Sequence, residues 1–477
     1  MLWLVLHCER LPFEVSAVAP LEEPAAVVDT AAGREVLRGC NGAATRAGLR
    51  PGMTLGAARA CLPGLSIAPR EPAIERAALE RLAAACYRFT DHVALEPPTD
   101  IALEIGGSRR LFGGLERLLE GVRGMTASLE RAAVQGIAPT PAAARLLAHH
   151  GGGRIERRDR LAEALGGLPV RTLDVDAATI ERLAGWGVTT LGECLALPRE
   201  GLVRRLGRPF LDYLDRLRGE RAESPPRFHP PGQFEAVVSM PEETRSLDWP
   251  IWAVGRLLVE LEAWLRGRDA GIQRLRIDLH HRRAPLQTVT VGLATPAREA
   301  AHMADLARER LERTTPAAPV TAVGVRVSSP VAYHPPVTDL WTDAGREPPE
   351  RLLERLRARL GREAVHGLAL AADHRPERAW LRAAPGATPA HEPVTPPPRP
   401  LWLLAKPGVL PLDARRWPQC RGALELLDGP ERIETGWWDG DDIERDYYVA
   451  RDPGGSLLWI YRERRVPARW FLHGLFA

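Results

Sequence analysis

Lysine is almost absent from this sequence, and several other features are missing as well. Lys406 is the only lysine among the 477 residues, so no lysine before that position can hold a triphosphate or form a Schiff base. The six cysteines form no Cys-x-x-Cys pair, which argues against a disulfide framework or a zinc site and fits a reducing, cytoplasmic location. No run approaches ~18 apolar residues, so we expect no membrane span. The net charge of +3 is too small to indicate nucleic-acid binding by itself.

The remaining composition is that of a large globular protein. With 45% apolar and 26% charged residues, the chain is long enough for three or four domains with real cores. The preference for arginine over lysine is most simply a compositional bias that also raises alanine, glycine and proline. Composition therefore leaves function open, and the motifs must decide it.

One stretch, Leu95 to Gly114, carries the most information. It predicts a buried strand from Ile101 to Ile105, a Gly-Gly turn, and a new element at Leu-Phe-Gly-Gly. It resembles the second carboxylate motif of the Y-family (UmuC-like, translesion) DNA polymerases, in which Ser-Ile-Asp-Glu-Ala-Tyr-Leu-Asp precedes a short loop and Leu-Phe-Gly. The resemblance places Asp100 on the family's glutamate and Thr99 on its catalytic aspartate.

We expect the first strand from Leu2 to Leu6. In the family, the corresponding strand carries the first metal-binding aspartate. Here His7 stands at that position, with Glu9 close behind, and Pro12 replaces the aromatic residue that gates the incoming sugar. Two-metal phosphoryl transfer needs clustered carboxylates, and histidine is a poor ligand for Mg²⁺. We therefore expect no metal and no cofactor, with His7 a partly buried histidine at a strand end. The alternative is a repurposed metal site built from His7, Glu9 and Asp100.

Two further segments resemble the family's triphosphate-binding elements. The run Asn41 to Met53 resembles a fingers segment whose tyrosine and arginine fall on Gly42 and Thr45. The run Val134 to Ala148 resembles a strand end and helix start whose lysine falls on Pro141, and proline is comfortable at a helix N-terminus. The resemblance thus implies that both nucleotide-binding elements keep their fold but lose their ligands.

The middle of the chain resembles the family's DNA-holding parts. Gly185 and Gly187 flank a tight turn between two helices, similar to a helix-hairpin-helix that binds a DNA phosphate; an αα-turn without a ligand is the alternative. After a proline-rich linker, the strand and helix pattern from 234 to 328 reads β-α-β-β-α-β, which resembles the family's little finger. Arg274 and Arg276 on its second strand are candidates for phosphate contacts, or part of a solvated sheet face.

The last third of the chain contains candidate docking elements. Leu340 and Trp341 resemble a sliding-clamp peptide of the Gln-Leu-x-Leu-Phe/Trp type, with Val337 in place of the glutamine; a loop aromatic packed on its own domain is the alternative. The last ~75 residues are rich in aromatic residues and predict a hairpin. The apolar terminus from Ala468 either closes this small β-domain or docks a partner.

Together these features predict an α+β multidomain fold with Y-family-like palm and fingers, a helix-hairpin-helix thumb, a little finger and a small β-rich C-terminal domain. The expected segments are palm and fingers, thumb, little finger, clamp peptide with helix and linker, and partner-binding domain, at residues 1–153, 154–222, 233–332, 333–400 and 401–477.

The resemblance implies a non-catalytic polymerase homologue that scaffolds error-prone translesion synthesis. The expected partners are primed, damaged DNA, the sliding clamp, an ImuA-like RecA-related protein and an error-prone replicative-type polymerase subunit. An active polymerase with an atypical metal site, and a DNA-binding repair factor outside translesion synthesis, are the alternatives.

Overall fold

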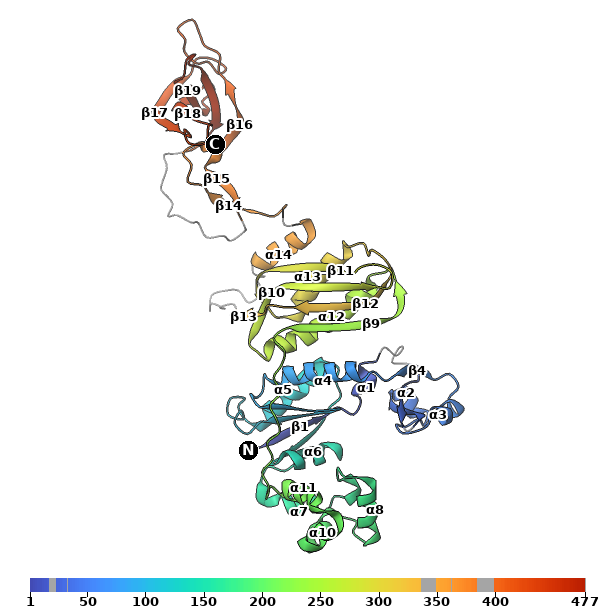
Figure 1. Cartoon of the computed structure of the whole chain (residues 1–477). Coiled ribbons are helices and arrows are strands. Elements are labelled where there is room, and N and C mark those ends of the chain that lie inside the picture. Colours follow the sequence, from blue (N-terminus) through green and yellow to red (C-terminus); the bar gives the residue numbers. More distant parts are fainter. Residues whose placement is uncertain (17–22, 32, 336–348, 362, 384–398, 477) are drawn as a thin grey trace. The chain divides into compact units, whose positions relative to one another are not determined.

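Figure 1 shows the computed structural model of the chain, which describes residues 1–16, 23–31, 33–335, 349–361, 363–383 and 399–476. The chain divides into two units, Met1–Arg359 and Leu360–Ala477. The first unit mixes sheets and helices, and the second is built mainly of strands. The expected α+β class with a β-rich C-terminal part is therefore confirmed, while the finer division into five segments stays a prediction.

The first unit begins with a five-stranded sheet. Its strands follow the order β5-β6-β1-β7-β8. The central strand β1 pairs antiparallel with β6 on one side and with β7 on the other. The bounds are β1 Trp3–His7, β5 Val93–Glu96, β6 Asp100–Glu104, β7 Val134–Ala138 and β8 Gly153–Arg154. The sequence-based strands at 2–6 and 101–105 are thus confirmed to within a residue.

Both faces of this sheet are buried, and successive residues of β1 alternate between them. Leu4 and Leu6 belong to the core formed with α4 (Pro72–Cys86) and α5 (Leu115–Ser128). Trp3 and Val5 belong to the opposite core, formed with α6 (Pro141–His149) and the helices after it. His7 continues the Trp3 and Val5 alternation, so its side chain lies on the α6 face.

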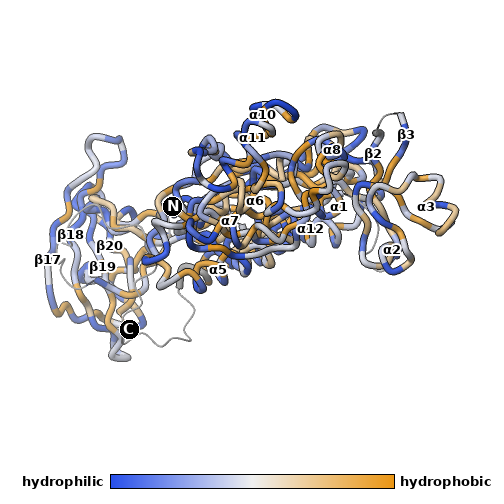
Figure 2. The backbone as a smooth tube through the Cα atoms, turned by 90° about the horizontal axis from the view of Figure 1, so that it is seen from below, coloured by the Kyte–Doolittle hydropathy of each residue, from blue (hydrophilic) through white to orange (hydrophobic). Residues whose placement is uncertain are grey.

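Helix α6 lies close to the sheet because of a glycine. A Cβ at Gly136 on β7 would lie 2.0 Å from the Ala144 oxygen of α6, so only glycine permits this approach. Figure 2 shows α6 as a largely hydrophobic segment. The helix begins at Pro141, as the sequence predicts, with the Thr140 hydroxyl accepting a hydrogen bond from the Ala143 amide.

A second, three-stranded sheet in the order β3-β2-β4 follows β1 in the chain. It carries three short helices. The bounds are α1 Leu11–Glu14, β2 Ala25–Ala31, β3 Arg34–Cys40, α2 Gly42–Arg46, α3 Leu55–Cys61 and β4 Ser66–Pro69. Strands β2 and β3 pair antiparallel.

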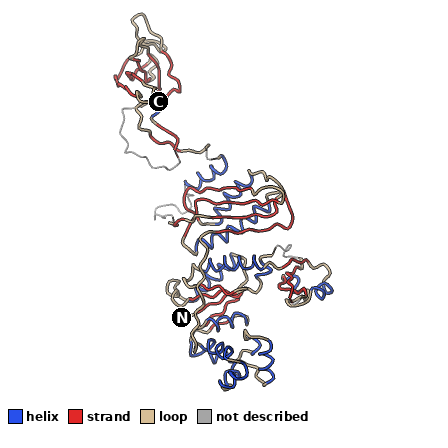
Figure 3. Tube along the Cα trace, in the orientation of Figure 1, coloured by secondary structure: helices blue, strands red, loops and turns tan. Residues whose placement is uncertain are grey.

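Five helices follow α6, and Figure 3 shows this region as helices and loops. They pack through Leu183, Leu214 and Leu217 onto the α6 face of the first sheet. The last helix ends at Gly219, which adopts the left-handed conformation at φ 76°. The bounds are α7 Leu161–Gly166, α8 Ala177–Gly185, α9 Leu191–Ala196, α10 Arg199–Leu206 and α11 Arg208–Arg218.

The rest of the first unit contains the predicted β-α-β-β-α-β order, which is confirmed. The sheet order is β11-β10-β12-β9, with β13 paired to β10, and both long helices share one core with its inner face. The bounds are β9 Phe234–Thr244, α12 Asp248–Arg266, β10 Ala270–His281, β11 Gln287–Ala297, α13 Ala300–Glu312, β12 Val320–Val327, β13 Val331–Ala332 and α14 Pro349–Leu360.

Charged side chains connect α12 to α4. The Glu260 carboxylate accepts hydrogen bonds from Arg81 at 2.6 Å and from Arg131 at 3.1 Å. All three side chains are at least four-fifths buried, so the pairing is shielded from water. Removing the carboxylate or a guanidinium group would leave an unpaired charge in a largely buried contact, which destabilises the fold.

The second unit is a five-stranded antiparallel sheet in the order β16-β20-β19-β18-β17, with a two-stranded ribbon beside it in sequence. The predicted hairpin corresponds to β18 and β19, and the apolar terminus forms β20, paired on both sides. The terminus therefore closes this sheet. The bounds are β14 Gly367–Leu370, β15 Trp380–Ala383, β16 Trp402–Val409, β17 Glu425–Thr435, β18 Ile443–Arg451, β19 Leu457–Glu463 and β20 Trp470–Leu475.

His473 on β20 is buried in an aromatic cluster. It is 1% exposed, its Nδ1 lies 2.9 Å from the Tyr447 hydroxyl, and its ring stacks on Trp459. Burial lowers the pKa of His473 to about 4; the carboxylate of Glu377 acts in the opposite direction, and the guanidinium of Arg445 lowers the pKa further. The imidazole is therefore neutral in the fold at physiological pH.

No helix among the described residues is long and apolar enough to cross a membrane.

Candidate functional site

Three side chains converge where β1, β6 and α6 meet. His7 Nδ1 lies 2.6 Å from Asp100 Oδ1, and His149 Nε2 lies 2.8 Å from Asp100 Oδ2. The two imidazole rings lie against each other, with centroids 4.0 Å apart. Across the described ranges this is the one set of at least three potential metal-ligating side chains that converge, their ligand atoms all lying within 4.8 Å of one another.

Sheet register and helix length bring the three residues together. His7, the last residue of β1, lies directly opposite Asp100, the first residue of β6. Asp100 shares its face of the sheet with Ala102, which packs in the core beneath α6. His149 is the last residue of α6, so its side chain reaches the end of the sheet at which His7 and Asp100 lie. Three separate elements therefore hold the cluster.

The electrostatics of the cluster centre on Asp100, which is 7% exposed. Burial acts to raise the pKa of Asp100, but hydrogen bonds with His149 and His7 outweigh it and hold the pKa below its ordinary value. The hydrogen bond to Asp100 raises the pKa of His149, against the opposing effect of burial. The carboxylate is thus ionised and shared between two imidazoles.

Thr99 and Glu9 take different places around this cluster. The Thr99 hydroxyl lies 3.5 Å from His7 Nδ1, and its carbonyl accepts a hydrogen bond from the Cys8 amide. Glu9 is exposed in the turn after β1 and is not part of the converging set. The structure groups His149, and not Glu9, with His7 and Asp100, so the alternative metal site of His7, Glu9 and Asp100 stays a prediction.

His149 was not among the residues that the sequence singled out. The available signal was a histidine pair, His149 and His150, at the predicted end of a helix that begins beside a strand of the same sheet. Helix length and the close approach at Gly136 decide that His149 meets Asp100, and neither can be read from a motif.

The positions expected to have lost nucleotide ligands lie on helix starts. Pro12 is buried in α1. Gly42 begins α2 and is exposed, while the Thr45 hydroxyl donates to the Asn41 carbonyl within the same turn. Pro141 is buried as the first residue of α6.

At the N-terminus of α6, a carboxylate of the chain itself occupies the first turn. The Ala142 amide donates a hydrogen bond to Glu223 Oε2 at 3.1 Å. Anions bind at helix N-termini because amide groups there lack partners. The Glu223 carboxylate thus lies at the helix start that, by the resemblance, faces the triphosphate in the polymerases.

The turn between α8 and α9 shows a similar arrangement. Gly185 and Gly187 are exposed, and Gly187 has a φ of 78°. The amides of Trp186, Gly187 and Val188 donate to carbonyls of α8, and those of Thr189 and Thr190 donate to the Glu193 carboxylate at 2.7 and 3.1 Å. The amides that would contact a phosphate are therefore already engaged.

Arg274 and Arg276 are exposed on β10, on the sheet face opposite α12 and α13. With Arg326 and Ser328 they line a shallow cavity of about 250 Å³. Arg326 lies 2.6 Å from the buried Asp278 carboxylate, so its charge is already balanced. Arg274 and Arg276 remain as the cations that face solvent in this cavity.

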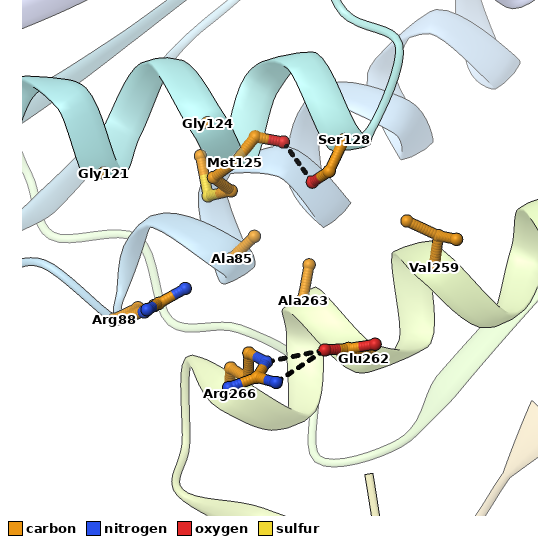
Figure 4. Close-up of a pocket in the computed structure, with 10 residues that line it drawn as sticks. All are labelled: Ala85, Arg88, Gly121, Gly124, Met125, Ser128, Val259, Glu262, Ala263 and Arg266. Carbon is orange, nitrogen blue, oxygen red and sulfur yellow. Dashed lines mark hydrogen bonds and ion pairs between the residues drawn. The ribbon is translucent and has the colours of Figure 1, made fainter. Parts of the chain in front are cut away.

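A larger cavity of about 360 Å³ lies where α12 packs against α4 and α5 (Figure 4). Small residues leave this space open, and Arg88 and Arg266 face it, with Arg266 paired to Glu262 at 2.7 Å. Burial lowers the pKa of Arg88, and the like charges of Arg266 and Arg298 lower it further. None of the residues singled out by the sequence lines this cavity.

Leu340 and Trp341, the candidate clamp peptide, lie outside the described residues, as does Val337.

The sequence is similar to a known protein family and to several named proteins. The family model described as IMS, the impB/mucB/samB family, matches residues 13–149. A protein named Protein ImuB from Caulobacter vibrioides (strain NA1000 / CB15N) is 30% identical over 464 residues, covering 90% of this chain and all of the relative. DNA polymerase IV from Shewanella sp. (strain ANA-3) is 24% identical over 208 residues, which is 41% of this chain and 56% of that one.

Among solved structures, DinB from Sulfolobus solfataricus matches with a TM-score of 0.39 and 16% identity, and an insertion ternary complex of Dbh DNA polymerase matches with a TM-score of 0.41 and 15% identity. Each match covers 70% of this chain and all of the other. The match to a relative 30% identical, which covers 90% of this chain and all of the relative, is the decisive one. The chain belongs to the ImuB family of Y-family, UmuC-like DNA polymerase homologues.

Proposed function

We propose that this chain is a non-catalytic Y-family polymerase homologue that scaffolds error-prone translesion synthesis after DNA damage. The observation that carries the proposal is the donor set at the end of the first sheet. One carboxylate, Asp100, is shared by His7 and His149. Two-metal phosphoryl transfer needs oxygen-rich sites for two Mg²⁺ ions, and one carboxylate with two imidazoles does not fit that requirement.

The triphosphate side of the site supports the same proposal. Positions 42, 45 and 141 carry glycine, threonine and proline, none of which brings a positive charge. Glu223 occupies the first turn of α6. The Glu223 carboxylate, which also lies 3.9 Å from Arg216, would have to leave the Ala142 amide before a phosphate could take its place, so nucleotide binding at this position is disfavoured.

If catalysis is absent, the protein can act only by placing other proteins on DNA. Membership of the ImuB family suggests three protein partners: the sliding clamp, an ImuA-like RecA-related protein and an error-prone polymerase subunit. For the clamp we propose Leu340 and Trp341 as the anchor. Burying two such side chains contributes on the order of 3–5 kcal/mol before ordering costs, which suits micromolar binding.

The second unit has a surface suited to a protein partner. Trp402, Trp437 and Trp438 are exposed, the last two on the loop after β17 with rings 5.4 Å apart. Exposed tryptophans are the side chains most often found as interface anchors. We therefore propose this unit as the docking site for the accessory protein or the polymerase subunit.

For DNA we propose contacts from the Arg274 and Arg276 face. These two exposed cations lie on one side of a sheet whose other side is buried. Backbone phosphates bind such cations without regard to sequence, which suits a scaffold that must act at many lesions.

One paired experiment tests the proposal. Purified full-length chain is assayed for Mg²⁺-dependent extension of a primed template, and in parallel for association with purified clamp, accessory protein and polymerase subunit. We expect no extension and stable association with at least one of the three. Robust extension by the unmodified chain would favour an active polymerase with an atypical site and would refute the proposal.

The clamp anchor has its own test. Replacing Leu340 and Trp341 together by alanine should abolish clamp association, and Val337→Gln should strengthen it, because glutamine completes the peptide pattern. The same two variants should leave association through the second unit unchanged. If the double alanine variant binds clamp as well as the parent chain does, the anchor lies elsewhere.

A further inference from the structure

We propose that His7, Asp100 and His149 together bind one divalent transition-metal ion of the zinc class. The three side chains come from β1, β6 and α6, and their ligand atoms already lie within 4.8 Å of one another. The ion would sit at the end of the first sheet and would join these elements. Zinc binding does not depend on the scaffold role, so either proposal can fail while the other holds.

The donor chemistry selects the class of metal. Two imidazole nitrogens and one carboxylate oxygen suit zinc and its neighbours in the transition series, whereas Mg²⁺ and Ca²⁺ require sites made largely of oxygen. The cysteines do not compete for the ion here, because Cys8, the nearest in sequence, is fully buried in the opposite core with Leu4 and Leu6. The site therefore departs from the magnesium chemistry that Y-family polymerases use.

The geometry requires only small movements. Zinc bonds to nitrogen and oxygen are about 2.0–2.1 Å long, which places the ligand atoms of a tetrahedral site about 3.3 Å apart. The present separations are 2.6 Å between His7 and Asp100 and 2.8 Å between Asp100 and His149. These two distances involve different oxygens of Asp100, and an ion held by one of them would draw in ligand atoms that already lie within 4.8 Å of one another.

Two of the three side chains are held in place by the sheet, and the third lies on a side that solvent can reach. The register of β1 with β6 fixes His7 opposite Asp100, and the Cys8 amide to Thr99 carbonyl hydrogen bond continues that pairing past His7. His149 is about one third exposed at the C-terminus of α6, so an ion and its fourth ligand, water, can enter from that side. Three protein ligands with one open position is a common arrangement for zinc.

A competing arrangement uses the same atoms without an ion. In it, the Asp100 carboxylate holds both imidazoles by hydrogen bonds alone, and the cluster is only a structural contact. The two arrangements differ in one measurable property. A structural contact binds no stoichiometric metal, whereas a metal site binds one ion and gains stability from it.

The experiment uses the full-length chain stripped with a chelator and then titrated with Zn²⁺, with Co²⁺ as a spectroscopic probe. We expect one Zn²⁺ per chain, a higher melting temperature, and visible Co²⁺ absorption typical of a four-coordinate site. Millimolar Mg²⁺ should not compete. His149→Ala should lower the affinity for Zn²⁺ at least tenfold and remove the Co²⁺ signal, and His7→Ala and Asp100→Asn should do the same.

His150→Ala is the matched control, since His150 is adjacent and exposed but lies outside the cluster. It should retain full binding. His149→Ala decides the matter if the other two variants do not fold, because His149 is the most exposed of the three. Absence of stoichiometric Zn²⁺ binding, or binding unchanged in His149→Ala, or an equal loss in His150→Ala, would overturn the proposal.

Discussion

Replacing Arg274 and Arg276 together by alanine should weaken binding to primed DNA in a way that depends on salt. The two side chains lie two residues apart on one face of β10, hence about 7 Å apart, so each can contact a separate phosphate. Each phosphate contact contributes about 0.9 to the slope of log affinity against log salt. The double variant should therefore lower that slope by about 1.8. Between about 50 and 200 mM salt, the parent chain should lose roughly twelvefold more affinity than the variant does.

The assay is fluorescence anisotropy with a labelled primed duplex at several salt concentrations. Arg282→Ala is the matched control: Arg282 is an exposed arginine of the same domain, but it lies 2.6 Å from Glu243, so its charge is already balanced. The control should leave the slope unchanged. If the double variant has the slope of the parent chain, this sheet face does not contact phosphates and the DNA-binding assignment is wrong.

Three further predictions follow from buried or capping charges. Glu260→Ala leaves two largely buried guanidinium groups without their carboxylate and should lower the free energy of unfolding by about 2 kcal/mol in chemical denaturation, whereas Glu80→Ala, at an exposed pair with Arg76, should change it by less than about 0.5 kcal/mol. Burial lowers the pKa of His473 to about 4, so the unfolded chain binds a proton below pH ~6.5 that the folded chain binds only near pH ~4. The stability of the second unit should therefore be full above pH ~6.5 and fall by about 3 kcal/mol as the pH drops through this window, as measured by hydrogen exchange of β20. His473→Gln should remove this pH dependence. Glu193→Gln removes the charge that holds the turn amides before α9 and should raise DNA affinity a few-fold in low salt; an unchanged affinity would show that this turn does not meet DNA.

Most of the fold follows from local patterns in the sequence. The continuous apolar run from Leu2 to Leu6, and the apolar stretch that begins at Ile101, predict strands buried on both faces, and helices do cover both faces of that sheet. The helix that begins at Pro141 and the helix that ends at Gly219 are marked by residues that suit a helix start and a left-handed cap. Such features depend on neighbours within a few positions, which is why a single sequence reveals them.

The site was only partly predictable, for a physical reason. His7 and Asp100 could be placed together because the family resemblance positions two adjacent strands. His149 and Glu223 could not, because their contacts are made between segments far apart in the chain: Glu223 reaches Ala142 over 81 positions, and His149 reaches Asp100 over 49. No short motif encodes contacts of that range.

Three carboxylates of the chain hold imidazole or amide groups at these positions, two of them across long sequence distances and Glu193 within its own capping box. Asp100 is shared by two imidazoles, Glu223 takes an amide at the start of α6, and Glu193 takes two amides before α9. An amide or imidazole left without its partner in a partly buried position costs free energy, so residues that satisfy these groups stabilise the fold. Restoring aspartates at His7 and Thr99 alone should not restore polymerisation, because Glu223 would still hold the Ala142 amide and Glu193 the amides before α9.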